Sequence, residues 1–480
     1  MHYLEFYYHC IGPKLSGRLD TDFWLRTILQ MAHGEPGVRS ALVALGHLNK
    51  SQSGSLQHAR QFAITACNPE RKIFLQSYNK AIRHLVNDMG KPSFTAEMGL
   101  VICLLFACIE LLQADANVAF AHIRSGLNIF YESRQRRQIT TESKATQENQ
   151  GHASVHWNGI EQVLVQLFIQ GLASALPLGV SLQKDFDYLT SCPKHFTGTS
   201  FASLADAGLS YSDLRGAAIL LARDMAEKVY GSLALTPSDY ERQHDLVSRH
   251  HAWLKALTDL ECSRIWTRDD IVTLSALKVE YYSSITACYC LTDDTQMEFD
   301  AHLAGFQSII THARYVVDSL DLPTRSSTLA SGAAANFTFH TSFIPALFFS
   351  AIRCRCPVTR RDAVSMLDPE LPREGLWDPA QYRKVAERVI EIEEMEVDER
   401  GWPARASRLC RSSVGIEVDE NGGYQADFLY AKDFALPTEK SWSERIELDA
   451  GIERLLPLRL QHVKVPSSQL HEQVFSESIA

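Results

Sequence analysis

Several short motifs that would mark a known chemistry are missing from this sequence. It has no glycine-rich phosphate loop, no Gly-x-Ser-x-Gly nucleophile turn and no His-Glu-x-x-His metal pair. No two of its 11 cysteines are separated by two residues, which is the spacing of zinc fingers and zinc clusters. We therefore predict that the chain is not an enzyme, and we assign no catalytic, metal or cofactor residues.

Long apolar runs are absent as well. The most apolar stretch, residues 98–109, lies between Glu97 and Glu110 and is shorter than the ~20 residues that a membrane-spanning helix needs. The first six residues lack the basic and apolar regions of a signal peptide. Most cysteines, such as Cys103, lie in apolar segments, as buried reduced thiols do. We expect no membrane contact, a reducing compartment, and a buried central helix at 98–109.

A concentrated basic stripe is also lacking. The chain carries a formal net charge of -10, but residues 1–140 hold 15 Lys and Arg against 10 Asp and Glu. The remaining residues hold 32 against 47, so the two parts carry +5 and -15. A nucleic-acid-binding domain usually gathers its positive charge on one face, because phosphate neutralisation supplies much of the affinity. No DNA-binding residues are found.

What the sequence does contain is helical periodicity. After Asn68 and Pro69, which suit a helix start, apolar residues recur on one face at Phe74, Tyr78, Ala81, Ile82 and Leu85. Gly90 and Pro92 end this helix, whose polar face holds Lys72, Lys80 and Arg83. A second amphipathic helix covers 160–175. Further helices are predicted near 20–33, 36–49, 94–131, 211–230, 237–258 and 270–291.

A narrow apolar seam with alternating spacings of four and three begins at Phe299 and ends at Leu320. Two interpretations stay open. The seam packs against a neighbouring helix of the same chain, as in helical bundles, or it forms a coiled coil in a homodimer or heterodimer. The first is favoured, because three heptads are the minimum for a coiled coil.

The order of these segments predicts an all-α fold, a multi-helix array or bundle with a small irregular or β-hairpin tail. Asn421-Gly422 lies between two β-prone runs and indicates the hairpin. Polar stretches at 132–151 and 324–336 read as loops or linkers. We expect a helical part at 1–132, a linker at 133–152, a second helical part at 153–400 and a tail at 401–480.

Two residue clusters could form a metal site or a catalytic site, but each also has a purely structural interpretation. Asp293, Asp294 and Glu298 could hold a metal ion in a helical enzyme, but their spacing differs from aspartate-rich metal motifs, which favours a solvated loop. Ser77 and Lys80 have the Ser-x-x-Lys spacing of some nucleophilic serines, yet no companion motif accompanies them.

Two charged runs also have both a functional and a structural interpretation. Residues 134–137, with three arginines, form either a nuclear-import patch or a solvated loop, and the loop is favoured. Residues 391–399 mix acidic with apolar side chains, as acidic activation segments do, although a helix end with a solvated face is favoured.

Strings spread over about residues 3–397 together resemble the regulatory, or middle homology, region of fungal zinc binuclear-cluster transcription factors. The N-terminal strings are Phe23-Trp24, Glu35-Pro36, Ala44-Leu45-Gly46, residues 78–82, and 103–106 with Glu110. The C-terminal strings are residues 347–349, Cys354-Arg355-Cys356-Pro357, Arg360-Arg361 and residues 373–377. In these strings Trp24, Phe106 and Trp377 suit a core, and Arg360, Arg361 and Arg373 suit bonds to carbonyls or carboxylates.

The resemblance implies a nuclear transcriptional regulator of a metabolic or secondary-metabolite gene set, acting through a helical region that binds a protein partner or a small-molecule effector. No effector-binding residue is assigned. The six-cysteine zinc cluster of the family is absent, and the sequence starts inside the regulatory region, so DNA binding would depend on a partner or on a segment outside it. A helical adaptor without a transcriptional role is the alternative function.

Overall fold

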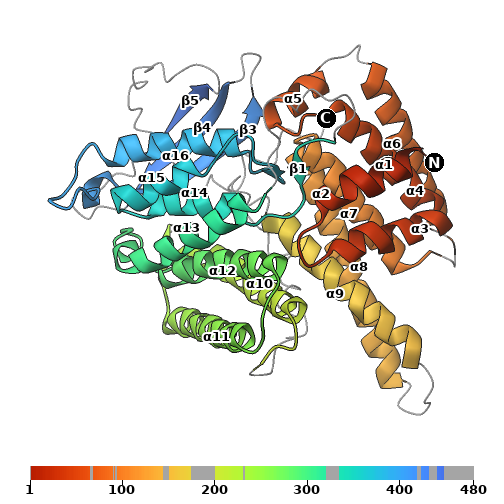
Figure 1. The fold of residues 1–480 in the computed structure, drawn as a ribbon, viewed down its shortest axis with the longest axis horizontal. Coiled ribbons are helices and arrows are strands. Elements are labelled where there is room, and N and C mark those ends of the chain that lie inside the picture. Colours follow the sequence, from red (N-terminus) through yellow and green to blue (C-terminus); the bar gives the residue numbers. More distant parts are fainter. Residues whose placement is uncertain are drawn as a thin grey trace.

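The computed structural model describes residues 2–64, 69–89, 91, 94–143, 151–173, 200–230, 233–320, 334–418, 423–431 and 441–447. Within these residues three groups of helices surround three apolar cores, and a small sheet covers one side (Figure 1). The all-α prediction with a small β tail is confirmed.

The first group is built around one helix, α7 (Ala96–Leu112), that is buried almost throughout. Its helices are α1 His2–Phe6, α2 Gly12–Leu15, α3 Ile28–Gly34, α4 Pro36–Ser51, α5 Leu56–Ile64, α6 Pro69–Asp88, α7 Ala96–Leu112, α8 Ala116–Ser143 and α9 Gly151–Ala173, with π-turns at Tyr7–Ile11 and Phe23–Thr27. Nearly every residue of α7 is buried, as predicted for 98–109. The helix predicted at 94–131 is two helices, because Ala114, with a positive φ of 61°, interrupts the helical backbone between α7 and α8. Residues 133–143, predicted to be part of a linker, continue α8.

The second and third groups share one helix. Helices α10 Leu204–Val229, α11 Pro237–Cys262 and α12 Arg268–Tyr289 enclose a core that contains Trp253. The other face of α12 packs against α13 Leu303–Asp318, which follows a 3-10 turn at Glu298–His302. Together with α12 and α13, helices α14 Ile344–Arg353, α15 Pro357–Ser365 and α16 Pro379–Glu393 enclose the third core. The seam from Phe299 to Leu320 therefore packs within the chain.

The tail forms a three-stranded antiparallel sheet. Strands β3 Leu409–Val418 and β4 Gly423–Tyr430 are the predicted hairpin, and β5 Ser441–Glu447 adds a third strand beside β4. The side of the sheet that carries Val414, Ala426 and Phe428 packs on α16 and its neighbours. The tail is thus part of the third core.

A short segment, residues 373–378, joins the first group to the third, and we call it the strap. Strand β2 Arg373–Glu374 pairs in parallel with β1 Phe337–Thr338. The Arg373 side chain enters the first group and donates to the carbonyls of Leu111 and Leu112, at 2.9 and 3.0 Å, and to those of Gly54 and Gly375. Leu111 and Leu112 end α7, where carbonyls lack helical partners. A buried arginine therefore caps the central helix.

The next residues of the strap cap three further helices. The Glu374 carboxylate accepts backbone N–H bonds from Ser342, Phe343 and Ile344 at 2.9–3.3 Å, at the start of α14. Asp378 accepts from the first turn of α16 and from Leu56 N, 3.0 Å away, at the start of α5. Free N–H groups at helix starts attract carboxylates. The strap thus fixes helices that lie more than 300 residues apart in the sequence.

A second polar junction lies where the first and second groups meet. The Arg215 guanidinium on α10 donates to Gln170 Oε1 on α9, at 3.0 Å, and to the Thr341 carbonyl and hydroxyl. It also lies 3.4 Å from a carboxylate oxygen of Glu280 on α12. His340, whose ring lies 3.4 Å from Gln170 Nε2, is half-buried, and burial lowers its pKa to about 3. Directional polar contacts therefore set the position of α10 against α9.

Helix α6 is attached to the first group along α4 and through one polar bond to α7. Only Phe74 and Ala81 are buried among its residues. The Tyr78 hydroxyl donates to the Glu110 carboxylate, which also accepts from Gln113 Nε2 at 3.0 Å. Burial raises the pKa of Glu110 to about 7, although both hydrogen bonds oppose that change. The attachment is sensitive to protonation near neutral pH.

Replacement of Arg373 should destabilise the fold more than replacement of an exposed arginine. Arg373→Met leaves four buried carbonyls without their donor, and we expect a loss of about 3–5 kcal/mol of unfolding free energy. The matched control is Arg361→Met, whose side chain is 54% exposed beside Glu394 and should cost about 0–1 kcal/mol. Urea unfolding followed by circular dichroism measures both. Equal losses would show that Arg373 is dispensable.

The pH dependence of stability should contain a contribution from Glu110. Because its folded pKa lies above the value of a free glutamate, that contribution is fully present below about pH 4.5 and is lost as the pH rises through 7. The melting temperature of wild type relative to Glu110→Gln should therefore fall between pH 5 and pH 8. Ser77→Ala, on the same helix pair, should leave the profile unchanged. A constant difference between wild type and Glu110→Gln would contradict the assignment.

Candidate functional site

Of the three carboxylates that were candidates for a metal site, Asp293 forms the hydrogen bonds of a turn. Asp293 accepts from Thr295 N at 2.8 Å, from the Thr295 hydroxyl at 2.6 Å and from Glu298 N at 2.8 Å. The Glu298 side chain is 54% exposed and lies 3.7 Å from His302. These are the local bonds by which an aspartate shapes a loop between helices. The segment is a loop between helices, as expected, with Asp293 and Asp294 half-buried in it.

The other candidate residues are not brought together with a reactive partner. Ser77 donates to the Ile73 carbonyl at 3.1 Å, one turn back on α6, and Lys80 is exposed. The arginine side chains at 134, 136 and 137 lie outside the described residues. Over the part of the chain that the structure describes, no group of three His, Cys, Asp or Glu side chains could hold a metal ion. No helix there is long and apolar enough to cross a membrane.

One residue of the acidic run is not on a solvated face. Glu393 ends α16 and is fully buried between two buried arginines. Arg355 donates to its Oε2, and Arg360 Nη2 donates to the same atom at 2.8 Å. Leu409 N donates to Oε1 at 2.9 Å, which fixes the start of β3. The expectation that this run forms only an exposed helix end is therefore wrong for Glu393.

The charges of this cluster decide its protonation. Burial alone would raise the pKa of Glu393, but the charges of Arg355 and Arg360 lower it below the ordinary value. The carboxylate therefore stays ionised at neutral pH. Nε and Nη2 of Arg355 are buried with no hydrogen-bond partner among the described residues, while Arg360 Nη1 lies 3.7 Å from a carboxylate oxygen of Glu394. Arg360 and Arg361 thus pair with carboxylates, as the sequence predicted for arginines in these strings.

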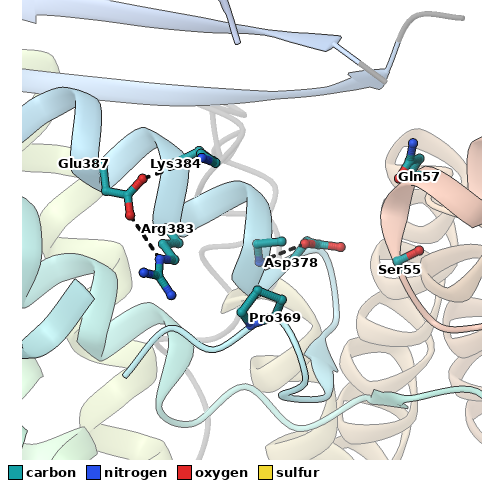
Figure 2. Close-up of a pocket in the computed structure, with 8 residues that line it drawn as sticks. Ser55, Gln57, Pro369, Asp378, Arg383, Lys384 and Glu387 are labelled. Atoms are coloured by element: carbon teal, nitrogen blue, oxygen red, sulfur yellow. Dashed lines mark hydrogen bonds and ion pairs between the residues drawn. The ribbon is translucent and has the colours of Figure 1, made fainter. Parts of the chain in front are cut away.

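A cleft of about 380 Å³ opens between α16 and the start of α5. Figure 2 shows Asp378, Arg383, Lys384 and Glu387 on the α16 side and Ser55 and Gln57 on the α5 side, with Pro369 at the edge. The two walls come from segments more than 300 residues apart, and Asp378 of the strap forms part of the boundary. A molecule bound here would contact the first and the third helical groups at once.

The cleft offers groups that bind polar ligands rather than groups that cleave bonds. Arg383 Nε lies 3.0 Å from Glu387 Oε1, and Lys384 Nζ lies 3.9 Å from Glu387 Oε2. Their side chains are about a third exposed, so the charges remain accessible to a ligand. Ser55 and Gln57 add a hydroxyl and an amide. The Asp378 carboxylate accepts from three backbone N–H groups, at the starts of α5 and α16.

Part of the chain is similar in sequence to a known transcription regulator. The chain is 32% identical over 133 residues to the aspercryptin biosynthesis cluster-specific transcription regulator atnN of Emericella nidulans. The match covers 27% of this chain and 19% of that protein, so the chain spans about a fifth of the curated relative that it matches. No family model and no solved structure matches. The chain is distantly related to a fungal transcription regulator.

The loop at Asp293 gives a prediction about metal ions. Because its carboxylate oxygens accept N–H and O–H donors, Mg²⁺ should leave the melting temperature of the wild-type chain unchanged. Asp293→Ala should cost about 1 kcal/mol through the lost turn bonds. Asp294→Ala, for which the structure shows no hydrogen bond, is the matched control and should be neutral. A Mg²⁺-dependent rise in the melting temperature that disappears in Asp293→Ala would restore the metal-site hypothesis.

Proposed function

We propose that this protein is a nuclear transcriptional regulator of a fungal metabolic or secondary-metabolite gene set and that its helical body is the regulatory region. The observation that carries the proposal is the 32% identity to a cluster-specific transcription regulator. The helical architecture and the lack of a metal cluster in the described residues agree with a regulatory role.

In this proposal DNA contact belongs to another segment or to a partner protein. The sequence has no cysteine spacing that fits a zinc cluster and no concentrated basic stripe. The regulatory region acts instead by changing its shape or its partners when an effector binds. Such a response requires that the effector has a different affinity for two states of the protein.

The cleft at α16 is the effector site that the geometry favours. A ligand between Lys384 and Gln57 would touch both helical groups, and it would change the free energy of any rearrangement between them. Asp378, which bonds to the starts of both α5 and α16, forms the boundary of the cleft. A ligand bound in the cleft would therefore affect the bonds that Asp378 of the strap makes to α5 and α16.

A reporter experiment tests the regulatory role. The full chain is fused to a heterologous DNA-binding domain, and we expect reporter output to change by about fivefold or more relative to that domain alone, the lower end of usual coupling. Arg373→Met, which should destabilise the body, is the control for a signal that needs the fold. An unchanged reporter, together with an unchanged transcriptome after gene deletion, would favour the adaptor alternative.

The cleft is tested in the same fusion. The double substitution Arg383→Ala and Lys384→Ala should shift reporter output by about fivefold or more, because it removes both cations that face the ligand. Its effect on stability should be small, since both side chains pair only with the partly exposed Glu387. Arg361→Ala, on α15, is the matched surface control. Wild-type output from the double variant would exclude the cleft as the effector site.

A further inference from the structure

One side of α6 exposes more apolar surface than a solvated helix needs. Leu75, Ile82, Val86 and Met89 leave 38, 37, 64 and 61% of their surface exposed, and Met89 directly follows the helix. Isolated exposed apolar residues are ordinary, but a contiguous group on one surface marks an interaction site.

These four residues form one stripe. Their separations of seven, four and three positions place them on the same face of an α-helix. The stripe from Leu75 to Met89 is ~21 Å long at 1.5 Å per residue. Figure 1 shows α6 at the outer edge of the first helical group, so the stripe lies on the periphery of the protein. The inner side of α6 is fixed by Phe74, Ala81 and the bond from Tyr78 to Glu110.

A row of positive charge runs beside the stripe. Lys72 and Arg83 are exposed and lie on the neighbouring face, eleven positions apart. Among the described residues neither pairs with a carboxylate, and Arg83 Nε only donates to the Asn79 carbonyl. The two acidic residues of α6, Glu70 and Asp88, lie on the side of the helix opposite this row by its 3.6-residue period. The positive charge next to the stripe is therefore not neutralised locally.

We propose that α6 is a docking site for an acidic amphipathic helix of a partner protein. The apolar face of that helix covers the stripe, and its carboxylates lie against Lys72 and Arg83. The positive charge of residues 1–140, +5 in a chain of net charge -10, supports the same polarity of partner. A helix of about 16 residues, ~24 Å long, matches the length of the stripe.

Two other occupants fit less well. In a symmetric contact between two copies, a twofold axis near Ile82 would bring the two Arg83 guanidinium groups close together, and like charges at an interface oppose association. A membrane surface would suit a helix whose apolar face is broad and flanked by cations on both sides. Here the stripe is one residue wide, and its other flank, which includes Tyr78 and Leu85, turns toward the protein.

The test uses the full-length chain and two synthetic helical peptides of about 16 residues. Both peptides carry leucines at helical spacing and a fluorophore, and their flanks carry Glu in one peptide and Lys in the other. By fluorescence anisotropy the Glu peptide should bind at least about tenfold more tightly than the Lys peptide. Raising the salt concentration should weaken it, because screening reduces attraction between exposed charges.

Variants on α6 assign the binding to the stripe and the row. Val86→Ser with Met89→Ser should weaken the Glu peptide by about tenfold or more, while melting temperatures confirm that the fold is kept. Lys72→Glu with Arg83→Glu should reverse the preference in favour of the Lys peptide. Lys255→Glu, an exposed lysine on α11, is the matched control and should leave the preference unchanged.

The following outcomes would overturn the proposal. Equal binding of both peptides, or binding that the stripe variants do not change, would show that α6 does not dock an acidic helix. Dimerisation in sedimentation experiments that Val86→Ser abolishes would assign the stripe to a second copy of the chain. Co-sedimentation with phosphatidylserine vesicles, lost in the same variant, would assign it to a lipid surface.

Discussion

The structure depends on the need to satisfy helix ends that are buried. The central helix α7 is buried from Met98 to Leu112, so its last carbonyls end inside protein, where water cannot reach them. Arg373 supplies the missing donors from a position more than 260 residues downstream. Burial lowers the pKa of Arg373 to about 10, which still leaves it charged at neutral pH. The first helical group therefore needs the C-terminal half of the chain in order to complete its core.

The same constraint explains why the strap carries alternating charge. Arg373 caps a helix end that exposes carbonyls, whereas Glu374 and Asp378 cap helix starts that expose N–H groups. Each side chain thus meets the helix terminus of opposite polarity. Gly375, between them, has a φ of 59°, which lets the chain turn from one group of helices to the other. Six residues in this way position four helices, α5, α7, α14 and α16.

Local features of the fold could be predicted from the sequence, but distant pairings could not. The spacing around Phe74 and the signal at Asn421-Gly422 predicted α6 and the hairpin, because both depend on neighbouring residues. Glu393 was misplaced because its acidic neighbours are exposed, and only the arrival of Arg355 and Arg360 makes a buried carboxylate tolerable. The cleft could not be predicted from the sequence either, because Gln57 and Lys384 line the same cleft only in the folded chain. Ile82, predicted on the apolar face of α6, belongs instead to its exposed stripe.

The cleft and the α6 stripe are joined by one continuous set of contacts. Asp378 at the cleft belongs to the strap, Arg373 of the strap holds the end of α7, and Glu110 on α7 accepts the bond from Tyr78 on α6. Contiguity alone does not couple two sites, because coupling requires an element with two arrangements that both ligands favour unequally. The strap meets the geometric part of that requirement, since it bonds to helices on both sides of the cleft. A ligand that favoured one position of the strap would therefore change the stability of the Arg373 bonds to α7. Through Glu110 it would also change how firmly α6 is attached.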